Sequence, residues 1–133
     1  MGVVLDTSVL VRTERQPGAD SFGPFADRGE VFIAALTVSE LLVGVHRADT
    51  EDRRSRRLAF VEGVLARTKV LDFTTATARI HAGLLAELQR HGTPIGAHDL
   101  LIAATAIAAG CAVVTTHPAE FERVTGLEVL TLQ

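Results

Sequence analysis

The chain has 133 residues, a formal net charge of −3 and a hydrophobic content of 47%. This length suits one domain with a sizeable core, so we predict a single domain over residues 1–133. The hydrophobic content excludes a disordered chain. The negative charge excludes a protein that coats nucleic acid through bulk positive charge. A local basic patch, or an acidic site that reaches phosphates through metal ions, is compatible with both numbers.

Cysteine use and the first residues predict a cytoplasmic protein. Cys111 is the single cysteine, so no internal disulfide can form, and its apolar neighbours predict a buried side chain. The first apolar run is short and contains Asp6, unlike a signal peptide. No charge-free stretch is long enough to span a membrane. We therefore expect a reducing cytoplasmic environment.

Strands and helices are predicted to alternate along the chain. The first half carries, in order, a strand at 2–5, a helix at Thr7–Arg12, a short helix within Gln16–Gly29, a strand at Val31–Ala34, a helix at Thr37–Ala48 and a helix at 51–67. The second half carries a strand at Lys69–Phe73, a helix at Thr74–Arg90, a loop at His91–Gly96, a helix at Asp99–Ala109, a strand at Ala112–Thr115, a turn or short helix at Pro118–Arg123 and a strand at Leu127–Leu130. This alternation predicts an α/β fold whose parallel sheet is covered on both faces.

Two of the predicted helices have distinctive ends. Thr37 and Glu40 match the capping box T-x-x-E, which places Glu40 in the first turn of its helix. The helix that begins at Asp99 is apolar all the way round, which predicts burial on most sides. Gly110 stands where a left-handed residue ends a helix.

Three acids share a position relative to this sheet. Asp6 directly follows the first strand, Glu40 opens the helix after the second, and Asp99 opens the buried helix that leads into the fourth. Each acid also has a structural explanation, because Asp6 and Asp99 could cap helices and Glu40 could complete a capping box. The position of Asp6 favours function, since ligands of open α/β sheets bind at the carboxyl ends of strands.

Together the three acids predict a metal site. Converging carboxylates repel one another and raise each other's pKa unless a cation lies between them. Oxygen ligands in such a group suit Mg²⁺ or Mn²⁺, and metal ions of this kind promote hydrolysis of phosphodiesters. 

Four motifs carry the most information, namely VVLDTSVLV, TVSELLVG around Glu40, IGAHDLLIAATAI around Asp99 and TTHPAEFERVTGL near the end. Together they resemble the motifs of a PIN domain, and more narrowly those of a VapC-type toxin of a bacterial toxin–antitoxin pair. The resemblance extends over nearly the whole chain, with the motifs in the family's order and spacing.

The resemblance implies a three-layer α/β/α domain with a central, mainly parallel five-stranded sheet. It implies an endoribonuclease dependent on Mg²⁺ or Mn²⁺, inhibited by a small antitoxin and assembled as a homodimer. Asp6, Glu40 and Asp99 match the family's acidic metal-site positions, and they would hold the ion that activates water. Ser8 matches a small polar residue beside the first acid, where it would support the site or simply start the helix.

His117 departs from the family pattern. In the T-x-N-x-x-[DE]-F pattern that TTHPAEF resembles, this position usually carries Asn or Asp. A histidine removes one negative charge relative to a four-acid site and favours Mn²⁺ or heavier ions over Mg²⁺. It could orient water or contact phosphate, or it could be a solvated loop residue. 

An arginine cluster is the candidate RNA-binding surface. Arginine binds phosphate in bidentate fashion, and four arginines begin the helix at 51–67, namely Arg53, Arg54, Arg56 and Arg57. The same residues could instead form a solvated helix face. Phenylalanine is the only aromatic residue type present, so base stacking on Trp or Tyr is excluded and backbone recognition is favoured.

Two other functions stay open on the sequence alone. The chain could be a catalytically weak PIN-like module that acts through a partner protein, because His117 replaces an acid. It could also be a phosphoaspartyl hydrolase with Asp6 as nucleophile. Such enzymes typically carry a second acid two residues later, where this chain has Ser8. 

Overall fold

The computed structural model describes residues 2–16, 18 and 22–133, and its centre is one five-stranded sheet. The strands are β1 (Val3–Leu5), β2 (Val31–Ala34), β3 (Lys69–Leu71), β4 (Ala112–Thr115) and β5 (Val129–Thr131). They lie in the order β3-β2-β1-β4-β5, and every neighbouring pair is parallel. This arrangement confirms the predicted α/β fold with a five-stranded parallel sheet.

Five α-helices and two 3₁₀ helices connect the strands in the described part of the chain. They are α1 (Thr7–Arg15), the 3₁₀ helix η1 (Gly23–Arg28), α2 (Ala35–His46), α3 (Glu51–Arg67), α4 (Thr75–His91), α5 (Ala97–Ala108) and the 3₁₀ helix η2 (Phe121–Arg123). The short helix predicted within Gln16–Gly29 corresponds to η1. Residues 17 and 19–21 of that segment lie outside the described residues. None of the described helices is long and apolar enough to cross a membrane.

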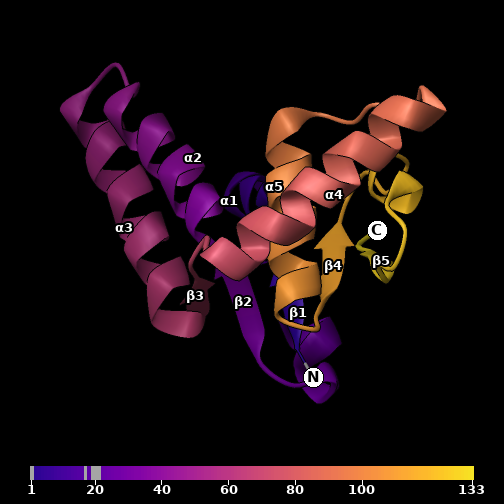
Figure 1. Cartoon of the computed structure of the whole chain (residues 1–133). Coiled ribbons are helices and arrows are strands. Elements are labelled where there is room, and N and C mark those ends of the chain that lie inside the picture. Colours follow the sequence, from indigo (N-terminus) through magenta and orange to yellow (C-terminus); the bar gives the residue numbers. More distant parts are fainter. Residues whose placement is uncertain (1, 17, 19–21) are drawn as a thin grey trace.

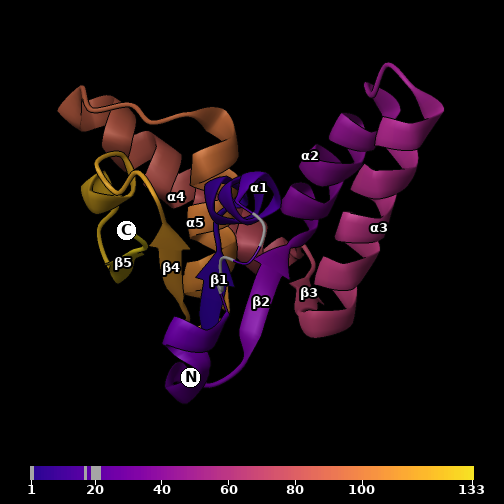
Figure 2. The ribbon, with the colours of Figure 1, turned by 180° about the vertical axis from the view of Figure 1, so that it is seen from behind.

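The sheet separates two hydrophobic cores, because successive side chains of a strand point to opposite faces. Val3 and Leu5 belong to the core beneath α1 and α3, whereas Val4 belongs to the core beneath α5. Figures 1 and 2 show α4 and α5 on one face, α1 on the other, and the α2–α3 pair beyond the β3 edge. Three layers therefore hold the central strands in place, with β1 fully buried.

The helix α2 begins two residues earlier than predicted, and the predicted capping box is wrong. Its N-cap is Ala34, so β2 runs directly into α2 without a loop, and no side chain caps this end. Thr37 is buried inside the helix, where its hydroxyl lies 3.0 Å from the hydroxyl of Thr7. Glu40 is therefore not an N3 capping residue, and its carboxylate is available for other partners.

Other boundaries also differ from the prediction. The strand β3 ends at Leu71, because Asp72 and Phe73 leave the sheet and are exposed. The helix α5 begins at Ala97 with Gly96 as its N-cap, so Asp99 is not a cap. Its predicted burial is confirmed, with an unbroken buried run from Ile102 to Ala106. Gly110 has a φ of 68° after the helix, as predicted for a left-handed terminating residue.

Candidate metal centre and basic groove

The topology opens a binding position between the ends of β1 and β4. From β1 the chain passes through α1 to β2 on one side, and β4 lies on the other side of β1. In open parallel sheets, ligands bind where the connections diverge in this way, beyond the carboxyl ends of the strands. Asp6 follows β1 here, and Thr115 ends β4.

Asp6 is held rigidly at this position. Its side chain is only 2% exposed, and its amide donates to the Val114 carbonyl at 2.9 Å. The hydroxyls of Ser8 and Thr115 each donate to Oδ2 at 2.8 Å. Oδ1 accepts no hydrogen bond from a described residue.

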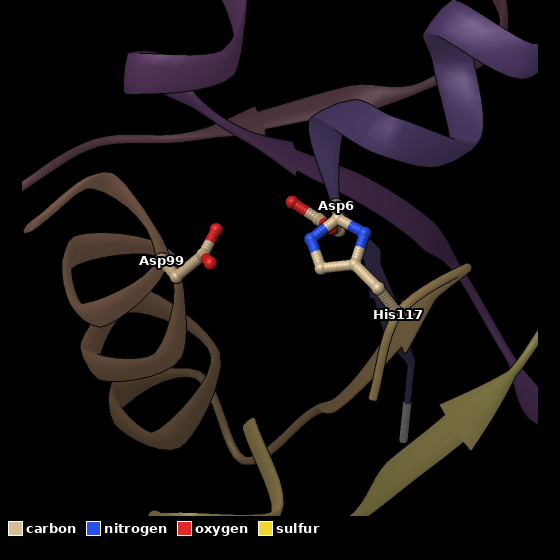
Figure 3. Close-up of side chains that lie close together, drawn as sticks. All are labelled: Asp6, Asp99 and His117. Carbon is tan, nitrogen blue, oxygen red and sulfur yellow. The ribbon is translucent and has the colours of Figure 1, made fainter. Parts of the chain in front are cut away.

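His117 lies directly across from Asp6. Its amide donates to the Thr115 hydroxyl at 3.1 Å, which fixes the start of the loop after β4. Its Nε2 is 3.6 Å from Asp6 Oδ2, and its ring centre is 6.4 Å from that of Phe121. Figure 3 shows the imidazole turned toward the space between Asp6 and Asp99. 

Asp99 enters the same space from the first turn of α5. Burial raises the pKa of its carboxyl, the negative charges of Asp6, Glu120 and Glu40 raise it further, and His117 lowers it. One ligand atom from each of Asp6, Asp99 and His117 lies within 4.8 Å of the others. We call these three residues the acid–histidine cluster.

The cluster has the donors that a divalent cation requires. Two carboxylates supply hard oxygen ligands, and a neutral imidazole supplies a nitrogen. Ligands that share one ion at about 2.1 Å stand about 3–4 Å apart, and the 3.6 Å between Nε2 and Asp6 Oδ2 falls in this range. Burial, and after it the negative charges of Asp6, Glu120 and Glu40, raise the pKa of the Asp99 carboxyl, and a cation bound between the carboxylates would lower it. The residues present therefore fit a divalent metal ion.

Glu40, the third predicted acid, lies outside the cluster. Its Oε1 accepts a hydrogen bond from the Thr7 hydroxyl at 2.7 Å, and its Oε2 is 3.1 Å from His98 Nδ1. Its charge still reaches Asp99 as the smallest of the effects that raise that pKa. The structure thus brings Asp6 and Asp99 together with His117, and holds Glu40 beside them.

Glu120 is a site residue that the sequence reasoning missed. Its Oε1 accepts a hydrogen bond from the Gly96 amide, at the N-terminus of the helix that carries Asp99. Its charge also contributes to the raised pKa of Asp99. The available signal was its place at the [DE] position of the pattern that TTHPAEF resembles.

The raised pKa of Asp99 predicts a pH-dependent stability change in metal-free protein. The folded state binds the Asp99 proton more tightly than the unfolded state, so stability falls as pH rises above the ordinary value of 3.8. Asp99→Asn removes this loss. Near neutral pH it should raise the melting temperature by on the order of 1–2 °C, a small effect because solvent screens a partly exposed group.

Thermal unfolding in a chelator, followed by circular dichroism at several pH values, measures this difference. The gain should shrink as pH approaches 3.8. A gain that stays constant with pH would contradict the electrostatic origin of the shift.

A groove of about 680 Å³ lies between α1, α2 and α3. Its charged lining residues are Glu14, Arg15, Glu40, Arg53, Arg56 and Arg57. The structure therefore places three of the four candidate arginines on the groove together with Glu40. Arg54 does not line it, because its guanidinium binds Glu51 and the Ala48 carbonyl.

The groove arginines differ in how they are partnered. Arg53 and Arg56 form ion pairs with Asp49 and Asp52, one helical turn earlier. Arg57 donates to the Gly44 carbonyl at 2.8 Å and has no acidic partner among the described residues. Its charge is the least neutralised of the three.

Comparison with known proteins places this geometry in a family. A family model described as PIN domain matches residues 3–127. Ribonuclease VapC1 of Rickettsia felis is 37% identical over 132 residues, which cover 99% of this chain and 97% of that protein. The tRNA(fMet)-specific endonuclease VapC of Shigella flexneri is 35% identical over 93% of this chain and 92% of that protein.

Solved structures with a similar fold come from the same group of proteins as the sequence relatives. The crystal structure of DNA-bound VapBC from Salmonella typhimurium contains a chain with a TM-score of 0.88 and 32% identity, and the match covers 98% of both chains. A chain in VapBC2 of Rickettsia felis, bound to a promoter DNA fragment, has a TM-score of 0.90 and 26% identity, and the match covers 100% of both. The chain therefore belongs to the PIN domain family and groups there with the VapC ribonucleases.

Proposed function

We propose that the chain is a metal-dependent endoribonuclease that serves as the toxin of a toxin–antitoxin pair. The observation that carries the proposal is the acid–histidine cluster, where Asp6 and Asp99 converge with His117. The ribonuclease names of its relatives support the same activity. A Mg²⁺ or Mn²⁺ ion held at the cluster would activate water and stabilise the charge that develops on an RNA phosphodiester.

Each acidic residue at the site would have its own role in metal binding or RNA binding. Asp6 would supply one carboxylate to the ion, held in place by the hydrogen bonds that its Oδ2 accepts from Ser8 and Thr115. Asp99 would supply the second carboxylate. Glu40 lines the groove and lies beside the cluster. It would therefore mark the point where an RNA strand bound in the groove reaches the metal ion. The Thr7 hydroxyl keeps the Glu40 carboxylate in place.

The basic groove would bind the RNA backbone. Arginines of α1 and α3 line it together with Glu40 of α2. Arg57 has the guanidinium with no acidic partner among the described residues, so binding it to phosphate breaks no ion pair. Arg54 has its guanidinium bound elsewhere and serves as a matched comparison from the same helix.

Arg57→Ala should weaken RNA binding by about tenfold, equivalent to about 1.4 kcal/mol, whereas Arg54→Ala should change it little. The RNA affinity of Arg57→Ala should also depend less steeply on salt. The negative slope of log K against log salt should become smaller in magnitude by about 0.7, the value for one phosphate contact on a single strand. Fluorescence anisotropy with labelled RNA, measured in an Asp99→Asn background that does not cleave, gives both quantities. Equal effects of the two substitutions would mean that the groove is not the RNA path.

A small antitoxin protein is the proposed partner. The similar structures of Salmonella typhimurium and Rickettsia felis are VapBC complexes, which supports a partner of this kind for the present chain. A homodimer, implied by the family resemblance, stays a prediction. An RNA substrate would place the activity in the cytoplasm.

Cleavage of RNA by the purified chain, free of antitoxin, tests the proposal. Total cellular RNA is incubated with Mg²⁺, with Mn²⁺ or with a chelator, and the 5′ ends of the products are mapped. Discrete cleavage ends with either ion, and intact RNA with the chelator, are expected. Intact RNA under all conditions would instead favour the catalytically weak module that acts only through its partner.

A further inference from the structure

His117 is placed by the fold and is not a free loop residue. Its amide is tied to the Thr115 hydroxyl at 3.1 Å, and that hydroxyl donates to Asp6 at 2.8 Å. One side chain thus fixes both the carboxylate and the main chain that presents the imidazole. Phe121, which is fully buried, stands beside the imidazole, with the two ring centres 6.4 Å apart.

The two nitrogens of the ring have different surroundings. Nδ1 lies 3.4 Å from the Thr116 hydroxyl, and Nε2 faces Asp6 at 3.6 Å. A proton on Nδ1, directed at that hydroxyl, leaves the lone pair of Nε2 pointing into the cluster. Metal-binding histidines use this arrangement, in which the nitrogen away from the ion is the donor.

We infer that His117 binds the divalent cation directly through Nε2, and that this nitrogen makes the centre prefer Mn²⁺ over Mg²⁺. The inference rests on the proposed function, in that the same ion would serve RNA cleavage. It assigns the ion a third protein ligand in place of the predicted Glu40, whose carboxylate is engaged by Thr7 and His98.

The chemistry of the donor set carries the preference. Mg²⁺ is held mainly through oxygen ligands and loses its water reluctantly. A neutral imidazole adds no negative charge to attract such an ion, but it adds a nitrogen that binds the first-row transition metals with increasing strength from Mn²⁺ onward. Two carboxylates also balance the charge of one divalent cation, so the cluster is complete without a third acid.

Pulsed EPR of bound Mn²⁺ tests the inference directly, because a ligating imidazole gives a ¹⁴N coupling that oxygen ligands lack. The unaltered protein should show this coupling, and His117→Asn should lose it while retaining its metal-free melting temperature. Mn²⁺ affinity, titrated by EPR with Mg²⁺ as competitor, should favour Mn²⁺ in the unaltered protein. In His117→Asn this preference should fall by about tenfold or more. His117→Asp should shift the preference further toward Mg²⁺.

His98→Asn is the matched control, because His98 is an exposed imidazole beside the site whose nitrogen contacts Glu40. It should keep the ¹⁴N coupling. The inference would be wrong if bound Mn²⁺ showed no nitrogen coupling, or if the coupling persisted in His117→Asn. Neither result would contradict the proposal that RNA cleavage depends on a metal ion. If Mn²⁺ showed the nitrogen coupling but the protein left all RNA intact, His117 would be a metal ligand and the proposed ribonuclease function would be wrong. Failure to bind Mn²⁺ at all would overturn both the inference and the metal dependence.

Discussion

Asp6→Asn is expected to slow RNA cleavage by about 10²- to 10⁴-fold, because metal-assisted charge stabilisation contributes several kcal/mol to such reactions. The fold should survive. The amide oxygen of asparagine can accept the two hydroxyl hydrogen bonds that Asp6 Oδ2 accepts from Ser8 and Thr115. The substitution removes the negative charge and replaces one carboxylate oxygen by an amide NH₂ group, so the side chain should bind a divalent cation much more weakly. 

Single-turnover cleavage of a mapped RNA site measures this effect. Asp72→Asn is the matched control, because Asp72 also follows a strand of the sheet, here β3, but is exposed and lies outside the cluster. Its cleavage rate should equal that of the unaltered protein. If Asp6→Asn cleaved at the unaltered rate with an intact fold, the acid–histidine cluster would not be the active centre.

Phe121→Ala is expected to lower the free energy of unfolding by about 3–5 kcal/mol, the usual cost of removing a buried aromatic ring. Phe121 is 0% exposed and packs in the core beneath α5 with Val4, Ile102 and Val113. No neighbouring side chain can fill the cavity without leaving its own place in that core. Urea-induced unfolding, followed by circular dichroism, gives the free energy.

Phe73→Ala provides the comparison, since Phe73 is 46% exposed and should change stability by less than about 1 kcal/mol. Phe121→Ala should in addition weaken Mn²⁺ binding, because the ring beside His117 is lost. Similar unfolding energies for the two variants would contradict the packing described for η2.

The sequence identified the parts of the site that depend on local patterns. Asp6 follows a strand and Asp99 lies in the first turn of an apolar helix, and periodicity predicts both placements. The start of α2 was missed because the apolar run continues through Ala34, Ala35 and Leu36 with no turn-forming residue between strand and helix. No local signal separates the last strand residue from the first helical one there.

Side-chain pairing between distant segments could not be predicted in the same way. Glu40 is directed by Thr7 and His98, which are 33 and 58 positions away. Glu120 is bound by an amide 24 positions away. Periodicity fixes which face of an element a residue occupies, but these contacts depend on how whole elements are placed against one another in three dimensions.

The hydrogen bond from Thr115 to Asp6 joins residues 109 positions apart, which bears on when the protein becomes active during synthesis. A nascent chain that has not yet reached β4 has no neighbour on that side of β1. It also has neither the hydroxyl that holds Asp6 nor the imidazole that completes the cluster. We therefore expect chains that end before β4 to lack the assembled cluster and to leave RNA intact.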